Sequence, residues 1–341
     1  MKLSLVVPCY NEAENMEAFL AACRKAFDGV LPSYELIFIN DGSRDDTWER
    51  LKQLRRQAPG QIQLINFSRN FGKEAAMYAG LQRAGGEYVT VIDADLQQPP
   101  AAALEMVRFL EANPDYDCVA AYQDNRREGK FTAWCKKIFY RLINAACEIP
   151  FRADASDFRT FRRDMVKAIL SMGEYHRFSK GIFSWVGFNT YYMPYTVQPR
   201  HAGQTSWSFR KLCRYAIEGI VSFSTFPLHI ATVTGAIMSV LSLIYILVVV
   251  IQKLAFGIAV PGYATIVVLI LLIGGLQMIM LGIIGQYIAR IYIQTKQRPL
   301  YIARDYLPAD GPADSGGSEQ PDAPDRSESP DKPEEKPEFP A

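Results

Sequence analysis

Three oxygen-bearing side chains stand at the end of one short apolar run and could together bind a metal ion. The run, residues 88–92 (YVTVI), is rich in β-branched residues and is typical of a buried strand. Asp93, Asp95 and Gln97 follow it directly. Mg²⁺ takes oxygen ligands and is commonly held by one or two carboxylates and the phosphates of a substrate. Aspartates also end strands and begin turns, so this stretch alone fits either a metal site or a plain turn.

Three earlier apolar runs end in polar residues in the same way, and helical patterns separate them. Strands are expected at 3–7, 34–39, 62–67 and 88–92, with helices between them. This alternation predicts a mostly parallel α/β sheet with right-handed crossovers. The carboxyl ends of such strands meet at one edge, so the polar residues there are expected to converge: Glu12, Asp41, Lys73 and Asp93. The sequence has no P-loop or dinucleotide-binding glycine motif, which argues against an ATPase or a dehydrogenase.

Two long apolar segments near the C-terminus are predicted to cross a membrane as a helical hairpin. Residues 228–252 contain one ionisable side chain, His229, and residues 263–287 contain none. Each exceeds the roughly 20 apolar residues that a bilayer core of about 30 Å requires. Buried helices of a soluble core are the alternative, but two such runs in succession disfavour it. Basic residues flank the pair and only Lys253 lies in its linker, so both termini are expected in the cytoplasm.

Charge and composition divide the rest of the 341-residue chain, whose net charge is +1. Two amphipathic segments have basic polar faces and are expected to lie on an anionic membrane surface, although most such helices pack on a protein core. The C-terminal tail is rich in Pro and acidic residues and should be disordered. The expected parts are a catalytic domain with an interfacial helix, a juxtamembrane helix, the hairpin, a basic cytoplasmic segment and the tail: 1–206 with 130–146, 207–226, 227–289, 290–307 and 308–341.

Cysteine and histidine usage points to a reducing compartment. The six cysteines are scattered without metal-ligand spacing, and the three histidines are too dispersed for a zinc site. The apolar run at residues 3–7 is too short for a signal peptide, so the first domain is expected to stay in the cytoplasm.

Four motifs in this order resemble glycosyltransferase family 2, whose members have the GT-A fold. They are VVPCYNE, FINDGSRDDT, FSRNFGKEAAMYAGL and IDADLQQPP. The later ASDFRTF and PRHAGQTSWS segments, with the hairpin, resemble the polyprenyl-phosphate branch, which includes bactoprenol glucosyltransferases and dolichol-phosphate mannosyltransferases. The resemblance covers roughly residues 1–307 and implies a Rossmann-like GT-A domain followed by two transmembrane helices.

The resemblance implies that the carboxyl edge binds a nucleotide sugar. Contacts to the nucleoside would come from Pro8, Tyr10, Glu12, Asp41 and Lys73. Asp93 would contact ribose and metal, and Asp95 and Gln97 would bind a Mg²⁺ or Mn²⁺ that bridges the diphosphate. Such a metal stabilises the charge that grows on the departing nucleoside diphosphate. Without the resemblance, Asp41 is better explained as a turn residue and Lys73 as a solvated helix start.

The acceptor that the resemblance implies is a polyprenyl monophosphate. A phosphate monoester has a second pKa of about 6, so it is mostly ionised at neutral pH and already nucleophilic. Asp157 matches the proposed catalytic aspartate and would act as a base or in positioning, with a helix N-cap as the alternative. Arg126 and Arg200 are candidates for phosphate contacts; plain membrane-facing charge is the alternative.

The expected reaction is inverting transfer of one sugar from a UDP-sugar to undecaprenyl phosphate at the bacterial plasma membrane, for modification of cell-envelope glycans. Glucose leads, with N-acetylhexosamine or mannose as alternatives. Three departures from the resembling sequences leave the sugar open: Gln123 where Arg is frequent, Ser206 where Lys is frequent, and Gln286 in place of an acidic residue.

Other classes of protein fit the sequence less well. A processive polysaccharide synthase would carry a Gln/Arg-x-x-Arg-Trp segment and more spans, and a transporter would also need more than two. A non-catalytic membrane scaffold would be indicated by lost metal ligands, yet the candidate ligands are all present. No nucleic-acid partner is expected, and a homo-oligomer is compatible with the sequence.

Overall fold

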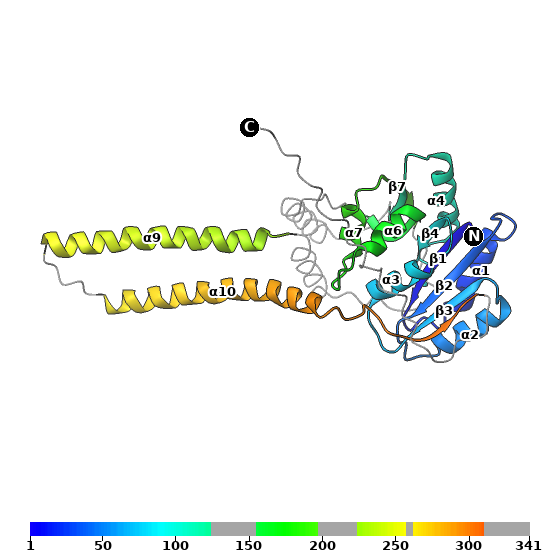
Figure 1. The fold of residues 1–341 in the computed structure, drawn as a ribbon, viewed down its shortest axis with the longest axis horizontal. Helices are drawn as coiled ribbons and strands as arrows, with labels where there is room; N and C mark the ends of the chain where they lie inside the picture. The colour runs from blue at the N-terminus through cyan, green and yellow to red at the C-terminus, as the bar shows by residue number, and fades with distance from the viewer. Residues whose placement is uncertain (124–154, 197–223, 257–261, 310–341) are drawn as a thin grey trace, which may run out of the picture.

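One eight-stranded sheet organises the α/β domain of the computed structural model, which describes residues 1–123, 155–196, 224–256 and 262–309 (Figure 1). Its strand order is β7-β5-β6-β4-β1-β2-β3-β8. The strands are β1 (Leu3–Cys9), β2 (Tyr34–Asn40), β3 (Ile62–Phe67), β4 (Tyr88–Val91), β5 (Cys118–Gln123), β6 (Ala155–Arg162), β7 (Thr190–Tyr195) and β8 (Ala303–Leu307). Strands β4, β1, β2 and β3 are mutually parallel, whereas β6 and β8 run antiparallel to their neighbours. The predicted mostly parallel fold is confirmed.

Helices cover both faces of the sheet because the central strands alternate apolar side chains between two cores. In β1, Leu5 and Val7 face one core and Val6 faces the other. The helices in the domain are α1 (Met16–Phe27), α2 (Thr47–Gln57), α3 (Lys73–Arg83), α4 (Pro100–Ala112), α6 (Arg163–Ser171) and α7 (Ser179–Trp185). Helices α1, α2 and α4 pack on the first core, and α3, α6 and α7 pack on the second. Helices on both faces bury the central strands β1, β2 and β3, apart from Pro8, which is half-buried.

Helix α3 lies unusually close to the sheet, and this places its first residue, Lys73, at the carboxyl edge. A Cβ atom built on Gly80 would lie 2.3 Å from Cγ1 of Val6 and 2.8 Å from Cδ1 of Ile39. Only glycine tolerates this approach without displacement of both strands.

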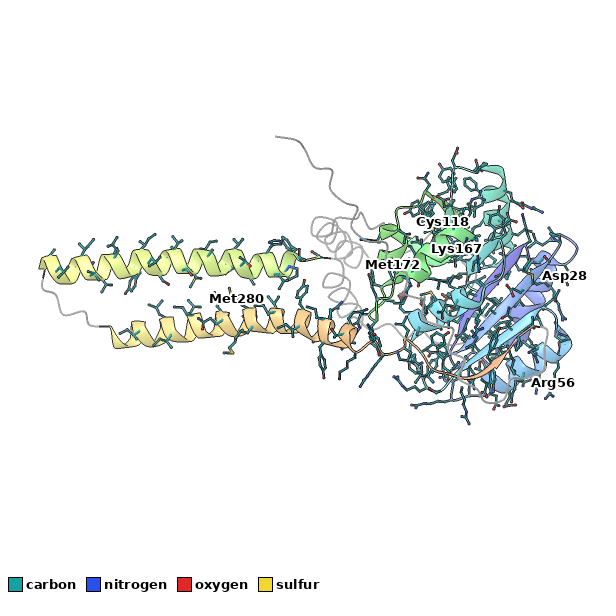
Figure 2. The ribbon with its side chains drawn as sticks, in the orientation of Figure 1. Asp28, Arg56, Cys118, Lys167, Met172 and Met280 are labelled. Atoms are coloured by element: carbon teal, nitrogen blue, oxygen red, sulfur yellow. The ribbon has the colours of Figure 1, made fainter. Side chains whose placement is uncertain are left out.

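Two long helices leave the α/β domain side by side (Figure 1). They are α9 (Phe226–Phe256) and α10 (Tyr263–Thr295), and they include the predicted spans 228–252 and 263–287. By length and composition, the segments that could cross a membrane are Phe226–Gln252 and Leu272–Thr295. Figure 2 shows their side chains standing away from both helices, Met280 among them.

After the hairpin the chain returns to the sheet as its last strand, β8. This strand pairs with β3 on the edge opposite to β7. The amide of Asn66 donates to Asp305 (2.7 Å), and Tyr301 stacks on Phe67 with 4.8 Å between ring centroids. Residues 290–307, predicted as a basic cytoplasmic segment, end in this strand, which the sequence did not predict and which completes the sheet.

Several other predicted elements fall outside the described residues. They are the interfacial helix 130–146, most of the juxtamembrane helix 207–226, the tail from residue 310, and the side chains of Arg126, Arg200 and Ser206.

We predict that Asp305→Ala lowers the stability of the domain more than Arg304→Ala. The first change removes the acceptor of the Asn66 amide, which is buried, and should cost about 1–3 kcal/mol. The second removes a neighbouring exposed charge from the same strand and should cost less than about 0.5 kcal/mol. Thermal unfolding of the full chain in detergent measures both. Equal melting temperatures would contradict a structural role for this contact.

Candidate active site

The loops after β1, β2, β3 and β4 meet at the carboxyl edge of the sheet. Cys9 pairs with Asn40 and Asn40 with Asn66, so the ends of three strands are in register. The fourth, β4, pairs with the other side of β1. The site is therefore assembled from four chain segments, each of which ends a buried strand.

Lys73 connects two carboxylates that lie on adjacent strands. Its Nζ atom is 2.6 Å from Oδ1 of Asp93 and 3.3 Å from Oδ2 of Asp157. Strands β4 and β6 are antiparallel with Val91 opposite Arg159. Continuing this register by two residues brings Asp157 opposite Asp93, so the sheet itself places the two carboxylates together. The three side chains remain 26–40% exposed and are thus open to a ligand.

The charges of this cluster stabilise one another. Burial opposes the charged form of Lys73, but the carboxylates of Asp93 and Asp157 outweigh it and raise the pKa of the ammonium group. Burial also opposes ionisation of Asp157, yet Lys73, Lys180 and Arg159 together lower the pKa of that carboxyl. At neutral pH the cluster therefore contains an ammonium group beside ionised Asp157.

Asp41 organises the loop that leads into α3. Its Oδ1 atom accepts a hydrogen bond from the backbone N–H of Phe71 (2.6 Å) and Oδ2 accepts one from Gly72 (2.9 Å). Burial raises the pKa of Asp41, although both backbone bonds favour the carboxylate. The loops approach closely at Gly42, where a Cβ atom would lie 2.4 Å from the carbonyl carbon of Arg69. Asp41 therefore helps to place Lys73, and its predicted contact with a nucleotide base stays a prediction.

The turn after β4 presents Asp93 and Asp95. Leu96 has φ +62°, a left-handed backbone conformation, within this turn. The Gln97 N–H donates to Oδ1 of Asp95 (3.1 Å). Gln98, which is buried, accepts from the Asp93 N–H (2.9 Å) and donates from its amide to Oδ2 of Asp93 (3.1 Å). We did not identify Gln98 from the sequence, since only its position in the folded turn shows that it orients Asp93.

The donor set at this turn fits a divalent cation held together with phosphates. Among the described residues no group of three or more His, Cys, Asp or Glu side chains could hold a metal ion unaided. Asp93 and Asp95 supply two carboxylates, which is the number that Mg²⁺ commonly takes from protein when a diphosphate provides further oxygens. The amide of Gln97 lies two residues away and is partly exposed.

The β1–α1 loop carries the remaining predicted nucleoside contacts. Asn11 has φ +56°, and its side chain accepts from the Arg44 N–H (2.9 Å), so this loop is fastened to the one after β2. Glu12 accepts from the amide of Asn15 (2.5 Å), Tyr10 is 43% exposed and Pro8 is half-buried in β1. Burial raises the pKa of the Cys9 thiol, and the charges of Glu12 and Asp93 raise it further.

A second wall of the site comes from α7, which we did not predict. Glu74 accepts hydrogen bonds from the backbone N–H of Ser179 (3.1 Å) and from its hydroxyl. Burial, and next the charge of Asp157, raise the pKa of Glu74 to about 7. Lys180 follows Ser179 and is close enough to lower the pKa of Asp157. The sequence offered no signal for this wall because Glu74 and Ser179 are 105 residues apart.

Gln123, one of the departures noted above, contacts a buried tyrosine beside the site. Its amide donates to the hydroxyl of Tyr195 (3.3 Å), and the tyrosine ring packs edge-on against Phe158 at 5.6 Å. Burial raises the pKa of Tyr195, and the charges of Asp93 and Asp95 raise it further. This pair lies on β5 and β7, so β6, the strand that carries Asp157, stands between it and β4.

A mostly parallel α/β sheet with paired carboxylates at its carboxyl edge fits the predicted GT-A glycosyltransferase, and sequence comparison shows this class. Residues 4–170 match Glycosyl transferase family 2, and residues 226–291 match the GtrB C-terminal hairpin. The chain is 40% identical over 304 residues to a prophage bactoprenol glucosyl transferase homolog of Escherichia coli (89% and 99% of the two chains). It is 39% identical over 306 residues to the bactoprenol glucosyl transferase of Shigella phage SfV, with the same coverage.

The chain therefore belongs to glycosyltransferase family 2 and is a hexosyltransferase, as predicted. Among solved structures, it is similar to glucosyl-3-phosphoglycerate synthase from Mycobacterium tuberculosis in complex with Mn²⁺ and UDP-glucose. That likeness has a TM-score of 0.46 and 18% identity, and covers 64% of this chain and 77% of the other.

We predict that Glu74→Gln changes how stability depends on pH. The folded state keeps the Glu74 proton up to about pH 7, whereas an unfolded glutamate loses it near its ordinary pKa of 4.5. A raised acid pKa contributes stability below the unfolded pKa that is lost as pH rises through the folded one. The variant should therefore become more stable relative to the native protein between about pH 4.5 and 7, with no further change above.

Melting temperatures from pH 4.5 to 8 measure this difference. Glu105→Gln, an exposed change on α4, is the matched control and should follow the native curve. Parallel curves for the native protein and Glu74→Gln would contradict the raised pKa.

Proposed function

We propose that the protein transfers glucose from UDP-glucose to a polyprenyl phosphate, with inversion at the anomeric carbon, at a membrane surface. The observation that carries the proposal is the contact of Lys73 with both Asp93 and Asp157. Lys73 thereby connects Asp93, which we assign to binding of the sugar donor, with Asp157, which we assign to the acceptor side. Both substrates carry phosphate, and an ammonium group between them is suited to each.

The donor side is proposed to be the edge formed by β1, β2 and β4. Asp93, Asp95 and Gln97 would hold a Mg²⁺ or Mn²⁺ with the diphosphate, and the metal would supply charge stabilisation to the leaving group. The loop carrying Pro8, Tyr10 and Glu12 is proposed to contact uridine. Support comes from the carboxylate pair itself and from the fastening of Asp93 by Gln98.

The acceptor side is proposed to be Asp157 with the wall from α7. A phosphate oxygen of the acceptor attacks the anomeric carbon, and the bond to UDP breaks with its electron pair leaving on UDP. The phosphate is already ionised, so no base is needed to deprotonate it. Asp157 and Lys73 would instead orient the attack, a contribution that positioning alone makes large. Arg126 and Arg200 remain proposed phosphate contacts.

The membrane setting is supported by the hairpin and by the names of the relatives, which are bactoprenol glucosyl transferases of bacterial or phage origin. Both ends of the hairpin connect to the same sheet, since β7 precedes it and β8 follows it. If α9 and α10 each cross the membrane once, the chain returns to the side from which it started, as a single sheet requires. With the positive-inside rule, it supports a cytoplasmic domain at the bacterial plasma membrane and cytoplasmic chain termini.

The same site would serve an N-acetylhexosamine or mannose donor, and the Gln123–Tyr195 pair is a place where the sugar could be distinguished. A scaffold without catalysis is disfavoured, because the carboxylates and Lys73 are arranged for ligands rather than sealed in a core.

We predict lipid-dependent release of UDP from UDP-glucose by the purified full chain. The assay supplies undecaprenyl phosphate, Mg²⁺ or Mn²⁺, and in turn UDP-glucose, UDP-N-acetylglucosamine and GDP-mannose. Asp95→Asn should lower the rate by about 100-fold or more, because it weakens stabilisation of the leaving diphosphate. Asp164→Asn, an exposed change on α6, is the control and should leave the rate unchanged. UDP release without lipid, or full activity in Asp95→Asn, would refute the mechanism.

We predict that Lys73→Met lowers kcat by about 100-fold, since two carboxylates are then left facing each other without a cation. Lys73→Arg keeps the charge and should retain more activity than Lys73→Met. Lys167→Met removes an exposed ammonium group on α6 and serves as the control. Equal rates for the methionine and arginine variants would show that charge at this position is not what matters.

A further inference from the structure

A loop between α6 and α7, residues 172–178, is attached to the last turn of hairpin helix α10. The Gln294 side chain donates from Nε2 to the carbonyl of Gly173 (2.8 Å), and its Oε1 accepts from the N–H of Tyr175 (2.8 Å). One carboxamide thus pairs with a donor and an acceptor of the loop backbone, as a neighbouring strand would. Neither glutamate nor alanine can reproduce both bonds.

With 263–287 as the membrane-crossing part, as predicted from the sequence, helix α10 is long enough to carry this contact beyond a membrane; the apolar window Leu272–Thr295 also includes Gln294. Its 33 residues correspond to about 50 Å at roughly 1.5 Å per residue. A bilayer core is about 30 Å thick, so the helix exceeds one crossing by several turns. Figure 1 shows the C-terminal end of α10 beside the α/β domain. Gln294 therefore lies on a continuous helix that runs from the hairpin to the domain.

The inner part of the loop is bound to α6 and α3. Arg177 donates to the carbonyl groups of Met172 (2.6 Å) and Ile169 (3.2 Å). Its guanidinium group also lies over the ring of Tyr78 on α3, 4.5 Å from the centroid. Arg177 thus connects the loop to α6 and α3. We expect a displacement of Gly173 and Tyr175 to be transmitted to Arg177 and the start of α7.

The loop leads directly into the second wall of the active site. Ser179, the first residue of α7, is bonded to Glu74, which follows Lys73 in the sequence. Lys180 comes next and its charge acts on Asp157. The position of the loop thus determines where Lys180 and Glu74 lie relative to the Lys73–Asp157 pair.

We propose that Gln294 is a positioning residue for sugar transfer. By fixing the α6–α7 loop to α10, it sets the start of α7 against Asp157 and ties the acceptor side of the centre to the membrane hairpin. The donor side is formed mainly by other segments, the loops after β1, β2 and β4. The proposal rests on the proposed function for its kinetic consequences, but the connection itself can be measured without an acceptor.

The kinetic test uses Gln294→Glu in the full chain, with Gln297→Glu as the matched control. The glutamate cannot donate to the Gly173 carbonyl, whereas Gln297 is exposed three residues further on. Gln294→Glu should lower kcat for lipid-dependent transfer by about tenfold while the KM for the nucleotide sugar stays within about twofold. The control should match the native protein. An unchanged kcat, or a KM for donor that rises as kcat falls, would overturn the proposal.

A double-mutant cycle tests whether Gln294 acts through the loop. Ser179→Ala removes the hydroxyl bond to Glu74 at the inner end. If both residues hold the same loop, the double variant should lose less activity than the product of the single losses. Losses that multiply would show independent roles and would overturn the proposed route.

Amide hydrogen exchange separates this proposal from the proposed function. Exchange at residues 172–180 should be faster in Gln294→Glu than in Gln297→Glu, in detergent and without any substrate. Unchanged exchange overturns the connection whatever the acceptor is. Failure of the unsubstituted protein to glycosylate polyprenyl phosphate instead overturns the proposed function and leaves the exchange result standing.

Discussion

The contact of one ammonium group with two carboxylates is the interaction on which the active site depends. The pairing of β4 with β6 brings Asp93 and Asp157 opposite each other. Two neighbouring carboxylates repel each other when both are ionised. Lys73 offsets this repulsion from α3, a helix that reaches the edge because Gly80 lets it lie against β1. Asp41 holds the loop before that helix through two backbone bonds. The β4–β6 register places the two carboxylates, and Gly80 and Asp41 place the ammonium group of Lys73 that neutralises them.

The features that could be predicted from sequence are those with a local physical signature. Apolar runs followed by polar residues predicted the carboxyl edge of the sheet. Long runs without charged residues predicted the two long helices, because a charged side chain in a bilayer core is energetically costly. Gln98, Glu74 and β8 were not predicted. Gln98 bonds to Asp93 only within the folded turn, in which Leu96 has a positive φ. Glu74 depends on a partner 105 residues away, and β8 depends on the free edge of β3. Their roles arise from tertiary contacts, which no short window of sequence contains.

Within the described part of the chain, two contacts join the α/β domain to the hairpin and the segment after it. Strand β8 fastens the chain after α10 to β3, and Gln294 fastens α10 itself to the α6–α7 loop. Two attachments restrict both the distance and the relative rotation of the α/β domain and the hairpin, whereas a single attachment would allow the domain to rotate about it. For the lipid acceptor that we propose, such a restriction would fix the direction of approach, which is part of the positioning that accelerates reaction.

The location of β7 and β8 on opposite edges of the sheet has a consequence for biosynthesis. The hairpin is inserted within the domain rather than appended to it, so β3 keeps an open edge until residue 307 has been translated. Strand β8 is the last of these elements to leave the ribosome, after both apolar helices. Open edges promote association between chains. Closure of the sheet therefore follows synthesis of the hairpin, and a chain that lacks β8 leaves the edge of β3 unpaired.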